Sequence, residues 1–155
     1  MATVAVLDIV RMATASRSIE IDVSPEVFFR VVQDYAHYPE FVPEVKSVRL
    51  GPRKGGALEV TYWLDVRLQL LEFTLRHEPR GTGRIEWHLV RGGGFMRRNA
   101  GAWIIEETPQ GFTRATYAID IDLGPLVPAR FEKALAERAL PNMLANFKAR
   151  AERLR

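Results

Sequence analysis

The sequence predicts an α+β fold in which a curved antiparallel sheet of about seven strands wraps around a long C-terminal helix. Three observations predict it. Apolar and polar residues alternate through the middle of the chain, helical patterns flank that region, and 155 residues suit one domain better than two. We expect residues 1–16 to form an arm or an extra element and residues 17–155 to form the domain.

The chain is expected to start with a strand and a helix. Every second side chain is apolar in residues 18–23, which is typical of a half-buried strand. Ser24 can cap a helix, Pro25 suits its first turn and Glu26 favours its positive end. We expect this helix to end near Asp34.

Residues 35–43 are rich in aromatic side chains and contain two prolines, which exclude a long regular helix. We expect a short helical turn or an ordered loop whose aromatics, Tyr35, Tyr38 and Phe41, face inward. These side chains either gate a cavity or cap the core of the sheet, and the two roles are compatible.

The middle of the chain predicts consecutive antiparallel strands, separated by turns rich in glycine and proline. Apolar positions change from even to odd between the second and third of these strands, so a turn or bulge is expected near residues 68–71. The last two strands form a hairpin about residues 108–111. The predicted strands cover residues 45–51, 57–66, 71–78, 85–89, 95–107 and 112–123.

A long helix is expected from about Val127 to Arg153, with a kink at Pro141 because proline lacks the N–H that a helix needs. One helix fills the concave face of such a sheet only in part. An apolar pocket is therefore expected between sheet and helix. The predicted apolar stripe of the helix consists of Phe131, Leu135, Met143, Leu144 and Phe147.

Several motifs resemble those of the coenzyme Q-binding START-domain family, within the polyketide cyclase/dehydrase and lipid-transport superfamily. They are VSPEVF at residues 23–28, DY at 34–35, YPEFVP at 38–43, NAGAW at 99–103 and LPNML at 140–144, together with Tyr117. The resemblance runs from about Ser18 to Glu152. It implies a helix-grip fold, with two short helices after the first strand, which agrees with the order of elements predicted above.

The resemblance also implies function. Members of this family include quinone chaperones, polyketide aromatase/cyclases and a bacterial ribosome-association toxin, so fold is implied more firmly than function. The first hypothesis is a carrier or chaperone for an isoprenoid quinone, a lipid or a polyketide-like molecule. The alternative is a polyketide aromatase/cyclase, and the third is a ribosome-associated protein. Whether the protein is an enzyme stays open. A protein partner or transient contact with a membrane also stays open. No DNA partner is expected.

The expected ligand-contacting side chains face the predicted pocket from the aromatic segment, the strands and the last helix. They are Tyr35, Tyr38, Phe41, Tyr62, Leu64, Phe73, Leu75, Trp87, Arg97, Asn99, Trp103, Tyr117, Ile119, Met143 and Phe147.

Two arginines are weak catalytic candidates. Arg97 and Asn99 share strand parity with Trp103, so all three point inward if Trp103 does. A bulge at Gly101 would instead turn Arg98 inward. Simple exposure of both arginines is an equal alternative. One inward polar group in an apolar pocket would orient a quinone or polyketide carbonyl.

His77 is the third catalytic candidate, but it has no identifiable carboxylate partner, so a structural or solvated role is favoured over acid–base chemistry. The other two histidines, His37 and His88, are not spaced along the sequence as ligands of one metal ion would be. Asp120 and Asp122 are expected to face solvent. The absence of cysteine excludes disulfides and thiolate metal sites, and no phosphate or dinucleotide motif is present. We expect no metal and no cofactor.

The net charge of +3 is modest, and acids alternate with bases along most of the chain. A solvated surface is therefore favoured over an anionic partner for the basic stretches, residues 91–98 and 148–155. No run of about 18 apolar residues could span a membrane. Asp8 and Arg11 make the start a poor signal peptide, so we expect a cytoplasmic protein.

Overall fold

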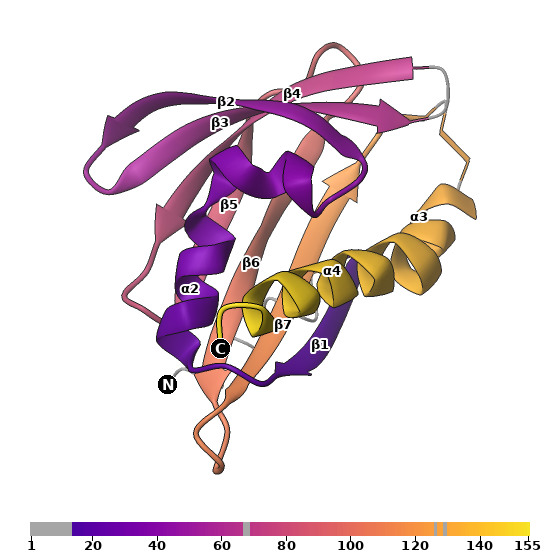
Figure 1. The fold of residues 1–155 in the computed structure, drawn as a ribbon. Coiled ribbons are helices and arrows are strands. Elements are labelled where there is room, and N and C mark those ends of the chain that lie inside the picture. Colours follow the sequence, from indigo (N-terminus) through magenta and orange to yellow (C-terminus); the bar gives the residue numbers. More distant parts are fainter. Residues whose placement is uncertain (1–13, 67–68, 126, 129) are drawn as a thin grey trace.

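The computed structural model describes residues 14–66, 69–125, 127–128 and 130–155. Its centre is a seven-stranded antiparallel sheet with the order β1-β7-β6-β5-β4-β3-β2. The helices α2 and α4 lie against the concave face of this sheet (Figure 1). The predicted helix-grip architecture is confirmed.

The elements follow the predicted order of strand, short helices, six strands and helix. The strands are β1 (Ala15–Ile21), β2 (Val45–Lys54), β3 (Ala57–Val66), β4 (Gln69–Pro79), β5 (Arg84–Arg91), β6 (Arg98–Glu107) and β7 (Thr113–Asp122). The helices are α2 (Pro25–Gln33), the 3-10 helix η1 (Tyr35–Glu40), α3 (Arg130–Ala134), the π-helical turn η2 (Leu135–Ala139) and α4 (Leu140–Glu152).

The start of α2 has the predicted cap. The Ser24 hydroxyl accepts a hydrogen bond from the backbone N–H of Val27 at 3.4 Å, and Pro25 occupies the first turn. The helix buries one face, formed by Phe28, Val31 and Val32, so its hydrophobic periodicity gives the packing face directly. η1 follows at once and buries Tyr35 and Tyr38, as predicted for the aromatic segment.

Alternation along the strands also predicts the correct faces. β3 and β4 pair with Val66 opposite Gln69, so the predicted parity change falls at residues 67–68, which lie outside the described residues. The β6–β7 hairpin turns where predicted. There Gly111 has a φ of +86°, which glycine adopts without the steric cost of a Cβ.

Several strand boundaries differ from prediction, most clearly in three strands. β1 begins at Ala15 and ends at Ile21, β2 continues to Lys54, and β6 starts only at Arg98. Backbone pairing with β7 and β3 decides where these strands end. Side-chain alternation alone carries no information about that pairing. The division into an arm of residues 1–16 and a domain of residues 17–155 stays a prediction, and residues 1–13 lie outside the described part.

The last helix is divided, not merely kinked. The wider turn η2 lies directly before Pro141, which cannot donate a backbone hydrogen bond. The prediction that Phe131 belongs to the buried stripe is wrong, because its side chain is 49% exposed. A π-helical turn shifts the rotation of the residues before it, so the stripe of α4 does not continue into α3. Leu144 and Phe147 are buried and Met143 is half-buried, as predicted, and the side chain of Leu135 lies outside the described part.

Candidate ligand-binding cavity

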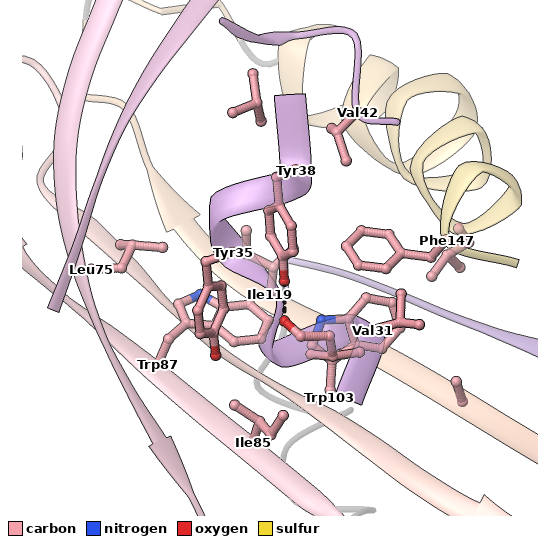
Figure 2. Close-up of a cluster of buried hydrophobic side chains, with 14 of the residues drawn as sticks. Val31, Tyr35, Tyr38, Val42, Leu75, Ile85, Trp87, Trp103, Ile119 and Phe147 are labelled. Carbon is pink, nitrogen blue, oxygen red and sulfur yellow. Dashed lines mark hydrogen bonds between the residues drawn. The ribbon is translucent and has the colours of Figure 1, made fainter. Parts of the chain in front are cut away.

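A cavity of about 230 Å³ lies between the concave face of the sheet, η1 and α4. Every predicted ligand-contacting residue except Phe41 and Arg97 lies on its wall. Figure 2 shows Tyr35 and Tyr38 extending from η1 toward the sheet. Sequence reasoning missed five apolar wall residues. Four of them, Val32, Val42, Val45 and Met96, lie outside the strand faces used for the prediction. The fifth, Ile121, lies on the predicted inward face of β7.

Packed aromatic rings form one end of the wall. Trp103 lies 5.1 Å from Phe147 and 4.9 Å from Tyr117, measured between ring centroids. Phe28 contacts Trp103 from behind at 5.4 Å. These contacts join α2, β6, β7 and α4, so the cavity wall is also part of the core. Tyr35, Tyr38 and Phe41 are also buried, as the core role requires, and their role as a gate stays a prediction.

All four tyrosines of the chain line this cavity. Tyr38 donates a hydrogen bond to the backbone carbonyl of Val32, and the Tyr62 hydroxyl lies 2.7 Å from Nε2 of His77. The hydroxyls of Tyr35 and Tyr117 make no hydrogen bond to other described residues. Burial raises the pKa of all four phenols, so they remain neutral and keep their protons at physiological pH.

His77 is a buried neutral side chain and not a solvated one. It is 7% exposed, and its ring stacks on Tyr35 with 4.4 Å between centroids. Burial lowers its pKa to about 3, because charging it would require removing an ion from water. Its bonding partner is Tyr62, and no carboxylate among the described residues contacts it. This neutral pair gives the wall a polar spot without a charge.

Asn99 is the second polar spot of the wall. Its Oδ1 accepts a hydrogen bond from Nε1 of Trp87 at 3.0 Å, and both side chains are buried. Its Nδ2 lies 3.6 Å from Sδ of Met96, which is a weak acceptor. Parity with Trp103 correctly places Asn99 on the inner face of β6.

Gly101 lies directly opposite Trp87 in the β5–β6 pairing. A Cβ at this position would come within 2.2 Å of the Ala118 carbonyl oxygen and 2.6 Å of Cζ2 of Trp87. The alternative of a bulge at Gly101 does not hold, because β6 and β7 pair in unbroken register. Glycine is needed here for close approach of the indole ring.

Neither candidate arginine faces the cavity. Arg97 precedes the first residue of β6, so strand parity does not fix its direction, and it is exposed. Arg98 is also exposed and forms a two-point ion pair with Asp120, with Nε–Oδ2 at 2.8 Å. The alternative of exposure therefore holds for both. Phe41 lies behind Phe147, at 5.0 Å, with the guanidinium of Arg150 5.1 Å from its ring.

The remaining titratable candidates are on the surface. His37 is exposed between Asp34, at 2.6 Å, and Glu40, at 3.7 Å, and His88 is also exposed. No three histidine or acidic side chains in the described part of the chain are placed to hold a metal ion.

Acidic partners neutralise much of the basic surface. Arg98, Lys148, Arg150 and Arg155 each pair with a carboxylate. The basic stretches therefore form no uniformly positive face of the kind that binds nucleic acid. Contact with a ribosome, a protein or a membrane stays a prediction, as do the absence of a DNA partner and the cytoplasmic location. No helix of the described residues is long and apolar enough to cross a membrane.

A family model described as polyketide cyclase/dehydrase and lipid transport matches residues 12–153. The chain belongs to this family. The superfamily expected from the motifs is thereby confirmed, and the family indicates hydrophobic-ligand binding, lipid transport or polyketide cyclisation. A search of curated proteins finds no match.

Solved structures of low sequence identity share the fold of this polyketide cyclase/dehydrase and lipid transport family member. The ZhuI aromatase/cyclase of Streptomyces sp. R1128 has a TM-score of 0.79 at 17% identity, covering 91% of this chain and 94% of that one. A START superfamily protein of Mycobacterium smegmatis has a TM-score of 0.79 at 20% identity, covering 91% and 98%. A STAR-related lipid transfer protein of Xanthomonas axonopodis has a TM-score of 0.70 at 13% identity, covering 90% and 87%.

Proposed function

We propose that this protein is a non-catalytic carrier or chaperone that binds an uncharged hydrophobic small molecule in the cavity. One observation carries the proposal: the described wall contains no Asp, Glu, Lys or Arg side chain and consists mainly of aromatic and aliphatic groups. Removing apolar ligand surface from water contributes about 25 cal/mol per Å². Nothing on this wall compensates for the loss of water around a charge.

The size of the cavity limits the ligand. Pockets for drug-sized molecules have volumes of about 300–1,000 Å³, whereas this cavity has about 230 Å³. One or two fused rings, or a short chain, fit without rearrangement. The head group of an isoprenoid quinone or a small polyketide-like ring system would suit it, and a longer tail would have to extend past half-buried wall residues such as Leu64, Ile121 and Met143.

The chemistry of the wall favours binding over acid–base catalysis. A general acid or base works best with a pKa near the operating pH. The pKa of His77 is lowered to about 3, and those of the tyrosines are raised above their ordinary value by burial. None of these groups exchanges protons readily near pH 7 in the closed cavity.

The test is native mass spectrometry of protein purified from its host, followed by organic extraction and identification of the bound molecule. We expect a stoichiometric, uncharged, apolar ligand. The variant Leu64→Trp, which fills the cavity, should lose it, whereas Leu50→Trp on the exposed part of β2 should keep it. An empty protein that also fails to take up added neutral aromatic compounds would overturn the proposal.

A second candidate is a polyketide aromatase/cyclase. The similarity to the ZhuI aromatase/cyclase favours it, as does the Tyr62–His77 hydrogen bond beside the Tyr35 ring, which gives a bound chain a neutral polar neighbour. Such an enzyme would act mainly by folding a flexible chain into a reactive conformation. A linear poly-β-ketone thioester is the probe: an unchanged product profile with and without protein removes this candidate. Loss of the cyclised product in Tyr62→Phe supports it.

A further inference from the structure

Several polar groups of the cavity wall lie around Trp87. Trp87 is at their centre: its ring centroid lies 5.0 Å from that of Tyr117 and 6.3 Å from that of His77, and its indole N–H binds Asn99. These residues come from β4, β5, β6 and β7. The wall on η1, β2, β3 and α4 carries the apolar Val45, Leu64 and Met143 together with the tyrosines of η1 and β3. The Tyr38 and Tyr62 hydroxyls already have partners, the Val32 carbonyl and His77.

The hydrogen bond from Trp87 fixes the direction of the Asn99 amide. An indole N–H can only donate, so the atom facing it at 3.0 Å must be the carbonyl oxygen of Asn99. The amide nitrogen then points away from Trp87. It carries two N–H groups: one faces the Met96 sulfur, and the other has no partner among the described residues.

Asn99 thus presents a buried donor and no acceptor to the cavity. The side chain is 5% exposed, so bulk water does not satisfy the free N–H. An unsatisfied buried donor costs free energy, which a ligand oxygen would recover. The neighbouring Tyr117 hydroxyl, also without a partner among the described residues, can donate to the same kind of group. The described part of the wall offers no cation that would compensate for desolvating a carboxylate.

We propose that the Asn99 amide, held in place by Trp87, selects a neutral aromatic ligand that carries a carbonyl oxygen, over hydrocarbons and carboxylates of the same size. This inference rests on the proposed function, because it assumes that the cavity binds a ligand. It adds which chemical group the ligand must carry and which residue recognises that group.

Three compounds with the same ring system and the same number of non-hydrogen atoms test the inference: 2-acetylnaphthalene, 2-isopropenylnaphthalene and 2-naphthoate. They present a neutral carbonyl, a hydrocarbon and a carboxylate. Affinity is measured by isothermal titration calorimetry on the wild-type protein. We expect the ketone to bind about tenfold more tightly than the hydrocarbon, as one buried hydrogen bond provides. The carboxylate should bind more weakly than the ketone by at least the same factor.

Two further measurements assign the effect to Asn99. In the wild type, the side-chain amide resonances of Asn99 should shift on binding of the ketone more than on binding of the hydrocarbon. In Asn99→Leu, a replacement of similar size, the ketone and the hydrocarbon should bind equally. Thr116→Val is the matched control, because it also removes a buried hydrogen bond, to Ser18, but lies outside the cavity wall. It should keep the tenfold preference.

The outcomes separate the inference from the proposed function. If the hydrocarbon binds as tightly as the ketone, the cavity binds ligands but Asn99 selects nothing, and the inference fails alone. The same holds if the preference survives in Asn99→Leu, or if 2-naphthoate binds best. If none of the three compounds binds the folded protein, both the inference and the proposed function fail. The wild-type series needs no variant, so a misfolded Asn99→Leu protein does not remove the test.

Discussion

Strands β4 and β5 present two chemically different faces. Leu75, His77 and Trp87 point to the cavity, and the side chains between them point to the opposite face. On that outer face arginines and glutamates form a row of ion pairs: Arg76–Glu78 at 3.2 Å, Arg80–Glu86 at 3.2 Å and Arg84–Glu86 at 2.6 Å. Adjacent residues of one strand therefore experience water on one side and an apolar enclosure on the other.

This difference teaches how the site keeps its polarity without charge. Ion pairs that solvent reaches, such as those of the outer face, contribute little to stability, about 0–1 kcal/mol each, and tolerate change. A polar group of the cavity must be neutral, because the apolar wall around it does not stabilise a charge as water does. The pKa values of two histidines show the difference between the cavity and the surface. Burial lowers the pKa of His77, whereas the carboxylate of Asp34 raises the pKa of the exposed His37.

The largest expected effect comes from placing the same charge on the two faces. Leu75→Glu introduces an unpaired carboxylate into the cavity wall and should lower the free energy of unfolding by about 4 kcal/mol. Arg76→Glu, one residue along the strand, should cost about 1 kcal/mol, since it loses half-exposed ion pairs with Glu59 and Glu78 and adds a repulsion that solvent screens. Urea denaturation measures both. Leu75→Met controls for shape and should cost less than about 1.5 kcal/mol. Equal losses in the two glutamate variants would contradict the contrast between the faces.

A middle-sized effect is expected from pH through His77. Its pKa of about 3 in the folded state lies below the ordinary value of 6.5, so the unfolded chain takes up the proton first as the pH falls. Its contribution is complete above about pH 6.5 and decreases below it, by about 2 kcal/mol between pH 7 and pH 5. In His77→Phe this part of the pH dependence should vanish, whereas His88→Phe, the exposed neighbour, should retain it. The prediction is refuted if the free energy of unfolding changes between pH 7 and pH 5 by the same amount in His77→Phe as in the wild type.

The smallest effect concerns the exposed histidine. The hydrogen bond to Asp34 and its charge raise the pKa of His37, with a further contribution from Glu40. The stabilisation is present below the ordinary pKa and is lost as the pH rises through the raised one. An NMR titration should show the pKa of His37 falling in Asp34→Asn, and falling less in Glu40→Gln. High salt should reduce both differences, because the site is open to solvent. A pKa insensitive to Asp34→Asn would disprove the assigned cause.

Much of the fold could be predicted because it depends on local patterns. Alternation in β3, β4 and β7 gives the inner faces, and Ser24 and Pro25 give the start of α2. The same alternation predicts the wall positions of Tyr62, Phe73 and Ile119. These predictions hold because period-two burial follows from strand geometry alone.

The rest depends on contacts between distant segments. Gly101 suggests a bulge in the sequence, but its role is the approach of Trp87 from another strand. The π-helical turn before Pro141 removes Phe131 from the buried stripe, and no residue pattern marks it. The direction of the Asn99 amide depends on its partner across the sheet. Such features are decided by tertiary packing, which one sequence does not contain.

The four tyrosines have a practical consequence. Because all of them line one cavity and none lies elsewhere in the chain, every tyrosine signal of this protein originates from the cavity. Reaction with a phenol-nitrating reagent therefore reports on this cavity alone. The rate of nitration measures how often the enclosure opens to water, and a ligand that seals it protects all four rings together. The protein thus carries an intrinsic chemical reporter of its own occupancy.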